Sequence, residues 1–556
     1  MKANANVANP YLPVWEHIPD GEPRIFKDPQ TGEQRLYVYG SHDSRMDHGY
    51  CGPDHVAWSA PLDDLTDWRF EGKLIDTSAL VGVSCMNADG QEETIVENSS
   101  RVLYAPDVIY YPDDEMYYMF LFPSPENKIF VAASKSPAGP FTDPKYLCDG
   151  FDPAALVDDE LDEKGRHKVY LYYSTETGRD GFACRLDPEN GMRVIPATMH
   201  YPDTYKANAD AEIASRATML SKNLAPFHFF EGPSIRKVNG WYILSYQRSA
   251  PTNPENTGIG RLAEIGWAYS KNPFGDPGYT EEALCDAWHF GGVIVSNLGE
   301  SVVDPYAEDP DHAVHIDTFY GENTHGGMVQ VRGQWYQVYH RATGNNLKRQ
   351  SLIEPFTMHF DATDGHPIIE QVEMTSQGVR ADGLDPYRMY YAAIACYEIG
   401  GRYVKGYWGE RTIYGKYPVF NCTTDGNYSA DGEHGDWYPV EDIRSRTWLG
   451  YKYFNFGDGL VDGKKPRLVL SLKECAPSTV RVYISEAKAN YNDTEKPKAL
   501  IGALDLPGID ASEHEVEISL APEQLRGKKG IYLEFISAGA ESETELVKLN
   551  KIGFRL

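Results

Sequence analysis

The sequence has little positive charge, no long apolar run and no apolar leader. Its 556 residues carry a formal net charge of −30, which repels phosphate backbones and anionic lipids, so we expect neither nucleic acid nor a membrane as a partner. No apolar run reaches the roughly 20 residues of a transmembrane helix. The N-terminus, MKANANVANP, lacks the apolar stretch of a signal peptide. This predicts a cytoplasmic protein, or a secreted one from which a signal peptide has been removed.

Closely spaced cysteines and helical periodicity are also scarce. The eight cysteines form no CxxC pair, which argues against a structural zinc site or a redox motif, and we expect mostly reduced, buried thiols. Short β-rich runs bounded by Gly, Pro, Asn and Asp dominate instead, which indicates an all-β fold. The 38 Tyr and 10 Trp suit strand packing and suit surfaces that stack on sugar rings equally well.

A repeat occupies the first two thirds of the chain. In each copy an acidic or small residue and Pro lead into an apolar strand, followed by a turn and a tyrosine-rich strand. The five copies contain GEPRIF, YAPDVIYY, FDPAALVDDE, FEGPSIRKVNG and THGGMVQV. Five such copies predict a five-bladed β-propeller over residues 1–370, each blade a small antiparallel sheet. Insertions near residues 190–225 and 290–318 are expected in loops on the functional face.

The last part of the chain has a different pattern. Segments such as RLVLSLKE, TVRVYISEA and VKLNKIGFRL alternate apolar and polar residues between turn signals. This alternation predicts a β-sandwich over residues 387–556, joined to the propeller by a linker at 371–386.

Three predicted blades place a carboxylate at or near the start of their first strand. These are Asp20 or Glu22, then Asp107, then Glu231. Because the first strands of a propeller line its central channel, these groups are expected to converge, and their mutual repulsion raises at least one pKa. The alternative is that each is a turn residue of an Asp-Pro or Glu-Gly-Pro loop. Asp152, in FDP, shows that position alone does not establish catalysis.

The motifs PDGEPRIF, YVYGSHD, APDVIYY, FDPAALVDDE, EGPSIRKVNGWYILSY and YQVYHR, in this order, resemble glycoside hydrolase family 43. The resemblance covers about residues 1–370. It implies a five-bladed propeller that acts as an inverting, exo-acting arabinofuranosidase, xylosidase or related enzyme, with no cofactor required for the chemistry. Inversion needs a general acid and a general base. The resemblance makes Glu231 the acid, Asp107 the carboxylate that orients the acid and tunes its pKa, and an Asp of the first blade the base.

The base is where this sequence departs from the family pattern. The family usually has Pro-Asp-Pro, whereas this chain has Pro19-Asp20-Gly21-Glu22-Pro23. Counting from the preceding NPYLP favours Asp20, and counting back from the strand favours Glu22. We favour Asp20 because the usual base is an Asp that follows Pro, and Glu22 remains the alternative.

Further residues are candidates for substrate or metal binding. His340, in YHR, is similar to a histidine that family members place at the propeller centre, often near calcium, and a hydrogen-bonded strand-end histidine is the alternative. Calcium prefers oxygen ligands, so water and carbonyls would hold most of it. Arg349 is a candidate for contacting a sugar hydroxyl or carboxylate, or it is a surface arginine. Tyr39, Trp58 and Phe151 are candidates for stacking on a pentose or are part of the blade core.

The C-terminal segment resembles the β-sandwich carbohydrate-binding modules of family 6, most clearly in its closing IGFRL strand. The resemblance implies a structural calcium and a stacking platform, or alternatively core aromatics; the candidates are Tyr451, Tyr453, Trp437 and Trp448. The expected substrate is an oligosaccharide or polysaccharide of plant hemicellulose or pectin. The expected product is α-L-arabinofuranose first, with β-D-xylosidase and exo-β-galactanase activity next, and a non-catalytic carbohydrate-binding protein as the rival class.

Overall fold

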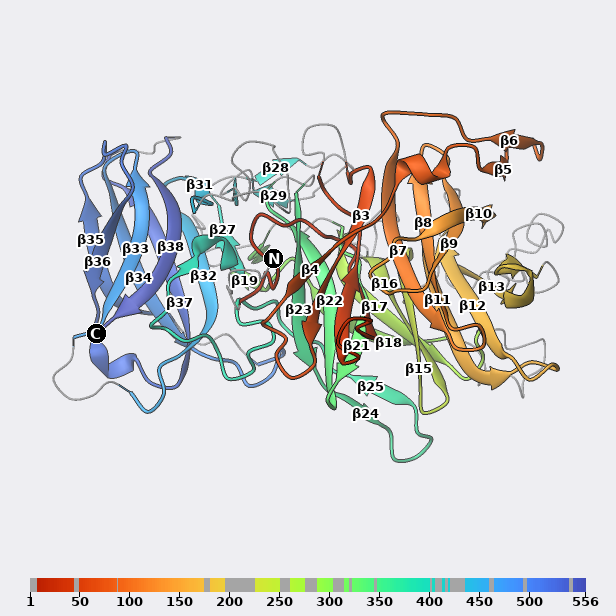
Figure 1. Cartoon of the computed structure of the whole chain (residues 1–556). Coiled ribbons are helices and arrows are strands. Elements are labelled where there is room, and N and C mark those ends of the chain that lie inside the picture. Colours follow the sequence, from red (N-terminus) through yellow and green to blue (C-terminus); the bar gives the residue numbers. More distant parts are fainter. Residues whose placement is uncertain are drawn as a thin grey trace.

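The protein is almost entirely β-structure in a computed structural model (Figure 1). The described residues are 8–44, 50–87, 89–174, 181–195, 226–250, 261–275, 288–303, 315–319, 323–344, 348–400, 403–405, 413–415, 419–420, 436–459, 465–493, 498–539 and 544–556. Within these ranges there is no α-helix, and hence no helix of the length and apolarity needed to cross a membrane.

Five antiparallel sheets of consecutive strands form the first part of the chain, four with four strands and the last with three. Blade 1 is β1 (Glu22–Lys27), β2 (Gln34–Tyr39), β3 (Asp54–Pro61) and β4 (Arg69–Asp76). Blade 2 is β7 (Val102–Tyr111), β8 (Met116–Ser124), β9 (Lys128–Ser134) and β10 (Thr142–Asp149). Blade 3 is β11 (Phe151–Leu161), β12 (His167–Ser174), β13 (Gly181–Asp187) and β14 (Arg193–Val194). Blade 4 is β15 (Phe229–Val238), β16 (Trp241–Ala250), β17 (Arg261–Ser270) and β18 (His289–Ser296), and blade 5 is β21 (Met328–Val331), β22 (Gln334–Ala342) and β23 (Arg349–Phe356).

The blades form a closed ring. Each pair of neighbouring blades encloses its own cluster of buried apolar side chains, including the pair of blades 5 and 1, where Val338 and Ile353 pack with Val38. A parallel bridge between Gly21 and Gly326, which lie just before the first strands of these two blades, joins the two blades. The prediction of a five-bladed propeller is therefore confirmed.

Prolines interrupt the first strands of blades 2, 3 and 4 at equivalent places. Pro106, Pro153 and Pro233 each lie where the register with the second strand shifts. Proline donates no hydrogen bond to a ladder and is tolerated in a strand at such a bulge. Bulges also redirect neighbouring side chains, and here the neighbours include Asp107 and Glu231.

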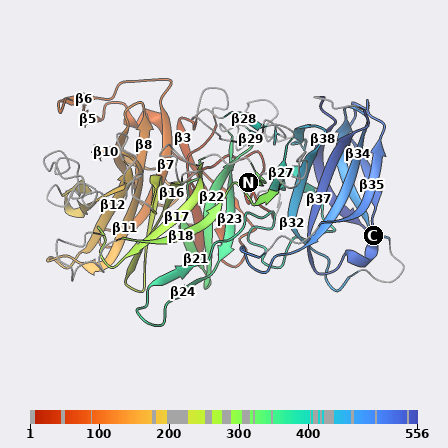
Figure 2. The same cartoon turned by 180° about the vertical axis from the view of Figure 1, so that it is seen from behind.

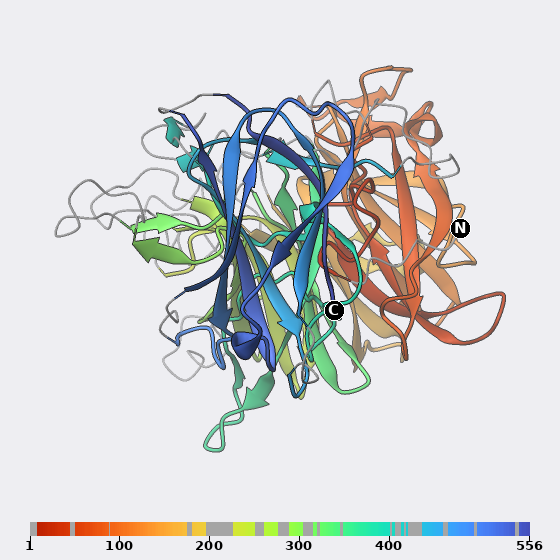
Figure 3. The ribbon, with the colours of Figure 1, turned by 90° about the vertical axis from the view of Figure 1, so that its left-hand side faces the viewer.

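The last part of the chain forms two antiparallel sheets packed face to face (Figure 3). One sheet holds β26 (Tyr390–Tyr391), β30 (Val419–Phe420), β31 (Val440–Ile443), β33 (Arg467–Glu474), β36 (His514–Ser519) and β38 (Val547–Arg555). The other holds β27 (Tyr397–Ile399), β32 (Thr447–Asn455), β34 (Ser478–Glu486), β35 (Ala499–Leu506) and β37 (Lys528–Ser537). Four two-stranded hairpins complete the strands: β5–β6 (Ser84–Met86, Glu92–Thr94), β19–β20 (Ser301–Val303, His315–Asp317), β24–β25 (Met358–Phe360, Pro367–Ile369) and β28–β29 (Tyr403–Lys405, Ile413–Gly415). The short 3₁₀ turns are η1 (Thr77–Leu80), η2 (Pro188–Asn190), η6 (Ala392–Ile394) and η7 (Pro522–Gln524).

The sandwich packs directly against blades 4 and 5 (Figure 2). One continuous cluster contains Trp241 and Tyr339 of the propeller together with Leu449 of the sandwich. The buried Arg341 of β22 donates hydrogen bonds to the carbonyls of Ala393 and Ala395. The prediction of a sandwich behind the propeller is confirmed, whereas the linker bounds at 371–386 and the likeness to family 6 modules stay predictions. The predicted insertion near 190–225 lies mostly outside the described residues.

Three of the four candidate aromatics of the sandwich are core residues, the alternative to a stacking platform that the sequence left open. Tyr451, Tyr453 and Trp448 are buried, and Tyr451 belongs to the main apolar cluster. Their positions in β32, between β27 and β37, place them in the interior, where a glycan does not reach. Trp437 is partly exposed, with the ammonium of Lys473 4.1 Å from its ring centroid.

A buried carboxyl group links the N-terminal segment and the predicted linker to blade 5. Glu354 of β23 accepts hydrogen bonds from the side chain of Asn9 and from the backbone and hydroxyl of Thr375. Burial raises the pKa of Glu354 to about 8, more than these hydrogen bonds lower it. The folded protein therefore holds this proton more tightly than the unfolded chain, whose Glu titrates near 4.5.

This difference predicts a pH-dependent stability. The contribution of Glu354 is complete below about pH 4.5 and is lost as the pH rises through about 8. Glu354→Gln keeps a neutral group of the same shape and removes the titration. Thermal unfolding of both proteins between these pH values should show the melting temperature of the wild type falling relative to that of the variant. Parallel curves would contradict the raised pKa.

Candidate active site

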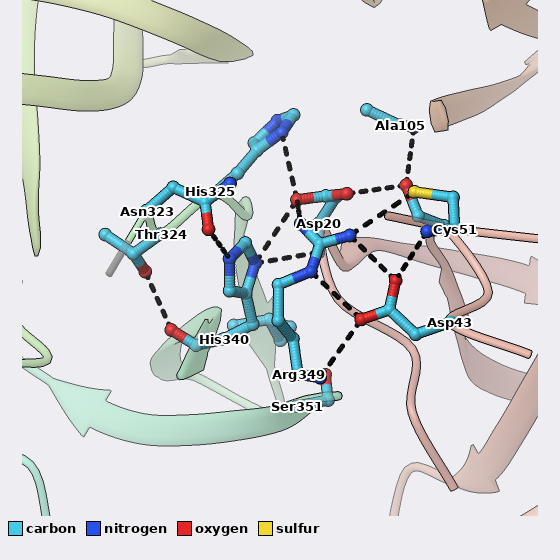
Figure 4. Close-up of polar contacts among 12 residues, drawn as sticks. Asp20, Asp43, Cys51, Ala105, Asn323, Thr324, His325, His340, Arg349 and Ser351 are labelled. Atoms are coloured by element: carbon cyan, nitrogen blue, oxygen red, sulfur yellow. Dashed lines mark hydrogen bonds and ion pairs between the residues drawn. The ribbon is translucent and has the colours of Figure 1, made fainter. Parts of the chain in front are cut away.

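Asp20 lies immediately before β1, at the channel end of blade 1, and contacts three basic side chains (Figure 4). Its Oδ1 is 3.2 Å from Nδ1 of His340, 3.7 Å from Nδ1 of His325 and 3.4 Å from Nη1 of Arg349. The hydroxyl of Ser41 donates to Oδ2 at 2.5 Å. The backbone of Asp20 has φ of 60°, a left-handed conformation that Asp tolerates better than most residues. This turn directs the carboxylate toward blade 5.

The surroundings of Asp20 keep its carboxylate ionised. Burial raises the pKa, but Arg349, the two histidines and the Ser41 hydroxyl together outweigh burial and lower it to about 2. The pKa of His340 is lowered to about 3, chiefly by burial, so this ring is neutral near pH 7. Asp20 is therefore a proton acceptor at every pH where the protein is expected to work.

Glu22 has a different environment, although only one residue separates it from Asp20. Its Oε1 accepts a hydrogen bond at 2.6 Å from Arg236 of blade 4 and lies 3.2 Å from Arg24. Burial raises the pKa of Glu22, but these two guanidinium groups and Ser234 lower it overall. Glu22 is thus held between two arginines by interactions that fix its position.

Asp107 continues the same chain of charges into blade 2. Arg24 donates to both of its carboxylate oxygens, at 3.0 and 2.6 Å, and the backbone N–H of Ala155 in blade 3 donates at 2.7 Å. Burial raises the pKa of Asp107 more than Arg24 lowers it, and the nearby charge of Glu22 raises it further. A line of alternating charges, Arg236, Glu22, Arg24 and Asp107, therefore crosses the channel from blade 4 to blade 2.

Glu231 lies near the start of β15, opposite Gln247 and between two register shifts of the ladder. Its side chain is partly exposed, whereas the preceding Phe230 is buried. The next residue, Gly232, packs so closely on His325 that a Cβ there would lie 2.6 Å from the ring. Since His325 also faces Asp20, the ring lies between the blade that carries Glu231 and the carboxylate of Asp20.

The predicted stacking residues of the propeller do not line the site. Tyr39 is completely buried between blades 1 and 2, where its hydroxyl donates to the carbonyl of Pro137. Trp58 is buried between blades 1 and 5 and donates to Glu16. Phe151 is 7% exposed and packs on Phe122. Tyr39 and Trp58 are corrected to blade core because both faces of a blade are covered by its neighbours, and Phe151 is corrected because it is buried against Phe122.

His340 and Arg349 do belong to the site: His340 is the hydrogen-bonded strand-end histidine given as the alternative to a metal ligand, and Arg349 contacts a carboxylate. The N–H of Asp20 donates to Nδ1 of His340, which places the ring proton on Nε2, 3.4 Å from Oδ1 of Asn323. This tautomer does not fit His340 as a metal ligand, and in the described part of the chain the group of three His, Cys, Asp or Glu side chains close enough to hold an ion is Asp361, Asp364 and His366, of which Asp364 is exposed. Arg349 is buried and contacts Asp20 in place of a predicted sugar.

Sequence reasoning missed several residues of the site. His325 begins blade 5, and Ser41 and Asp43 end the motif YVYGSHD, so both lie in motifs that were already noted for the blade pattern. Tyr104 is partly exposed and stacks on Phe122, at 5.2 Å between ring centroids. Arg349 and Asp152 are near enough to influence its pKa, so Tyr104 is an aromatic residue close to the site.

The arrangement predicts that Glu22→Gln destabilises the protein. The variant leaves Arg24 and Arg236 buried with one carboxylate fewer, and removal of one partner from a buried ion pair costs about 3–5 kcal/mol. Thermal and urea unfolding should show this loss, while the folded variant keeps its catalysis. Glu160→Gln, at an exposed ion pair with Lys168, is the control and should unfold like the wild type. A Glu22→Gln variant with wild-type stability would contradict the charge line.

The site combines an ionised carboxylate on blade 1 with a partly exposed carboxyl on blade 4, and a pair of carboxyl groups is what a glycoside hydrolase requires. Comparison with known proteins agrees with this class. The sequence model of Glycosyl hydrolases family 43 matches residues 63–364. The chain belongs to this family, and it is a glycoside hydrolase.

Two curated relatives agree with this assignment. A "Xylosidase/arabinosidase" of Thermoclostridium stercorarium is 31% identical over 469 residues, which are 80% of this chain and 82% of that protein. An "Arabinoxylan arabinofuranohydrolase" of Paenibacillus polymyxa is 27% identical over 60% of this chain and 45% of its own length. A family 43 arabinoxylan arabinofuranohydrolase from Bacillus subtilis, solved with cellotetraose, is 19% identical, with 99% of this chain and 98% of that chain covered and a TM-score of 0.42. The rival class of a non-catalytic binding protein is not supported.

Proposed function

We propose that this protein removes terminal pentose units from arabinoxylan-type plant glycans by inversion, with α-L-arabinofuranose as the preferred sugar. The observation that carries the proposal is the position of His325, which faces the ionised carboxylate of Asp20 and packs on Gly232, the residue next to Glu231. The names of the two curated relatives, a xylosidase/arabinosidase and an arabinofuranohydrolase, support the choice of sugar.

In the proposed mechanism Asp20 is the general base and Glu231 the general acid. Asp20 takes a proton from water as the water oxygen bonds to the anomeric carbon, and Glu231 gives its proton to the departing oxygen. Asp107 orients and tunes the acid from the second blade. Ser41 and Arg349 hold the carboxylate of Asp20 in place, and His340 accepts a hydrogen bond from the Asp20 backbone N–H.

The test is hydrolysis of para-nitrophenyl α-L-arabinofuranoside and β-D-xyloside by the purified protein, with the first-formed anomer followed by proton NMR. Faster release from the arabinoside with inverted configuration is the expected result. A preference for the xyloside would favour the second candidate, β-D-xylosidase, which the double name of the first relative also supports. Retention of configuration would overturn the assignment of Asp20 as a base.

A further inference from the structure

Asp43 binds Arg349, the arginine that in turn contacts Asp20, the proposed base. Its Oδ1 accepts from Nη2 of Arg349 at 2.9 Å and from the backbone of Cys51 at 3.0 Å. Its Oδ2 accepts from Nε and from the backbone N–H of Arg349, both at 3.0 Å. Asp43 is 1% exposed, so its contacts are made with protein groups rather than with substrate.

The guanidinium of Arg349 is therefore shared unequally between two carboxylates. Asp43 holds it in the two-point geometry that is strongest for Arg and carboxylate. Asp20 receives a single longer contact, 3.4 Å from Nη1. The ring of Tyr50, 4.8 Å from the guanidinium carbon, packs over the group. Asp43 thus orients the guanidinium group of Arg349 so that Nη1 faces Asp20 (Figure 4).

This division matters because a base must accept a proton. A carboxylate in a two-point ion pair with Arg is a weak base, since its protonation breaks two charge-assisted hydrogen bonds. A single long contact orients the carboxylate and leaves most of its electron density available. Removal of the charge on Asp43 would free Nε and Nη2 of Arg349 to pair with Asp20.

We infer that Asp43 is a positioning residue for the general base: it engages Arg349 so that Asp20 is oriented but not neutralised. The inference rests on the proposed function, in which Asp20 takes the proton of the attacking water. In that step one O–H bond of water breaks, the proton passes to Asp20 and the remaining oxygen bonds to the anomeric carbon. Asp43 itself exchanges no proton.

The first experiment measures kcat and KM of Asp43→Asn on the glycoside that the wild type cleaves best. We expect kcat to fall about 10–100-fold with KM nearly unchanged, because the base and not the sugar pocket is altered. Asp43→Glu keeps the charge and should recover part of kcat. Asp28→Asn is the matched control: Asp28 is also buried in blade 1 and holds an arginine, Arg69, but lies at the opposite end of β1.

A second experiment separates positioning from a general structural effect. In Asp20→Gly with added azide, the azide ion attacks the anomeric carbon directly, and residue 20 receives no proton. Adding Asp43→Asn to this variant should change the azide-dependent rate by less than about twofold, because the group on which Asp43 acts is absent. Thermal unfolding checks that each variant is folded.

The inference is overturned if Asp43→Asn keeps the kcat of the wild type, or if it lowers the azide-dependent rate as much as the normal one. Each comparison is a ratio of rates on one substrate. A wild type that prefers xylosides would therefore overturn the proposed sugar without affecting the role of Asp43.

Discussion

Asp20→Asn is expected to lower kcat by about 10²–10⁴-fold, the usual contribution of a general base. Asparagine keeps the shape of the side chain and can still accept from Ser41, but it cannot take a proton from water. The loss should be similar for glycosides with good and poor leaving groups, because activation of water is needed in both cases. Steady-state hydrolysis of para-nitrophenyl and oligosaccharide substrates measures it.

The same experiment decides between the two candidate bases of the sequence. Glu22→Gln, at a carboxylate already held by Arg24 and Arg236, should remain active when folded. An active Asp20→Asn together with an inactive Glu22→Gln would move the base to Glu22. Azide should restore cleavage of the glycoside in Asp20→Gly, with a glycosyl azide as the product, since a small anion can occupy the space left by the carboxylate.

Glu231→Gln is expected to produce the second large loss, also about 10²–10⁴-fold, but with a different dependence on substrate. The departing oxygen of an oligosaccharide is strongly basic and needs a proton, whereas nitrophenolate leaves more easily without one. The variant should therefore lose much more activity on arabinoxylan oligosaccharides than on a nitrophenyl glycoside. The basic limb of the pH–rate profile should also disappear, because it reports deprotonation of the acid.

A control for this loss is available on the same blade. Glu264 of β17 is also partly exposed but pairs with Arg248 of β16, and Glu264→Gln should leave the preference between leaving groups unchanged. An equal loss of Glu231→Gln on both kinds of substrate would contradict its role as general acid and indicate a role in binding.

The blade pattern was predictable because it is local. Tyrosine-rich hairpins and turns recur along the chain, a proline accompanies the acidic residue in four of the copies, and each copy folds into one sheet. The prolines were noted only as part of the repeat. The structure shows that they lie at register shifts, next to Asp107 and Glu231.

The aromatic candidates were wrong for a physical reason. Alternation along a strand distinguishes two faces, but in this propeller both faces of a blade are packed against neighbouring blades. Tyr39 and Trp58 therefore lie in two different cores, and neither contacts solvent. For the same reason the sequence did not single out Tyr104 as a site residue. It resembles the other strand tyrosines in sequence, and it lies near the start of β7.

The sequence by itself determined the strands, the number of blades, the sandwich and the set of acidic residues near the channel, because strand patterns and turns depend on neighbouring residues. Only the tertiary structure separated Asp20 from Glu22. Only Gly21 lies between the two residues, yet their partners come from two different blades that are distant in the sequence. These are Arg349 and His340 for Asp20, and Arg236 for Glu22. Charge environments of this kind arise when the ring of blades closes, and no local pattern of the sequence predicts them.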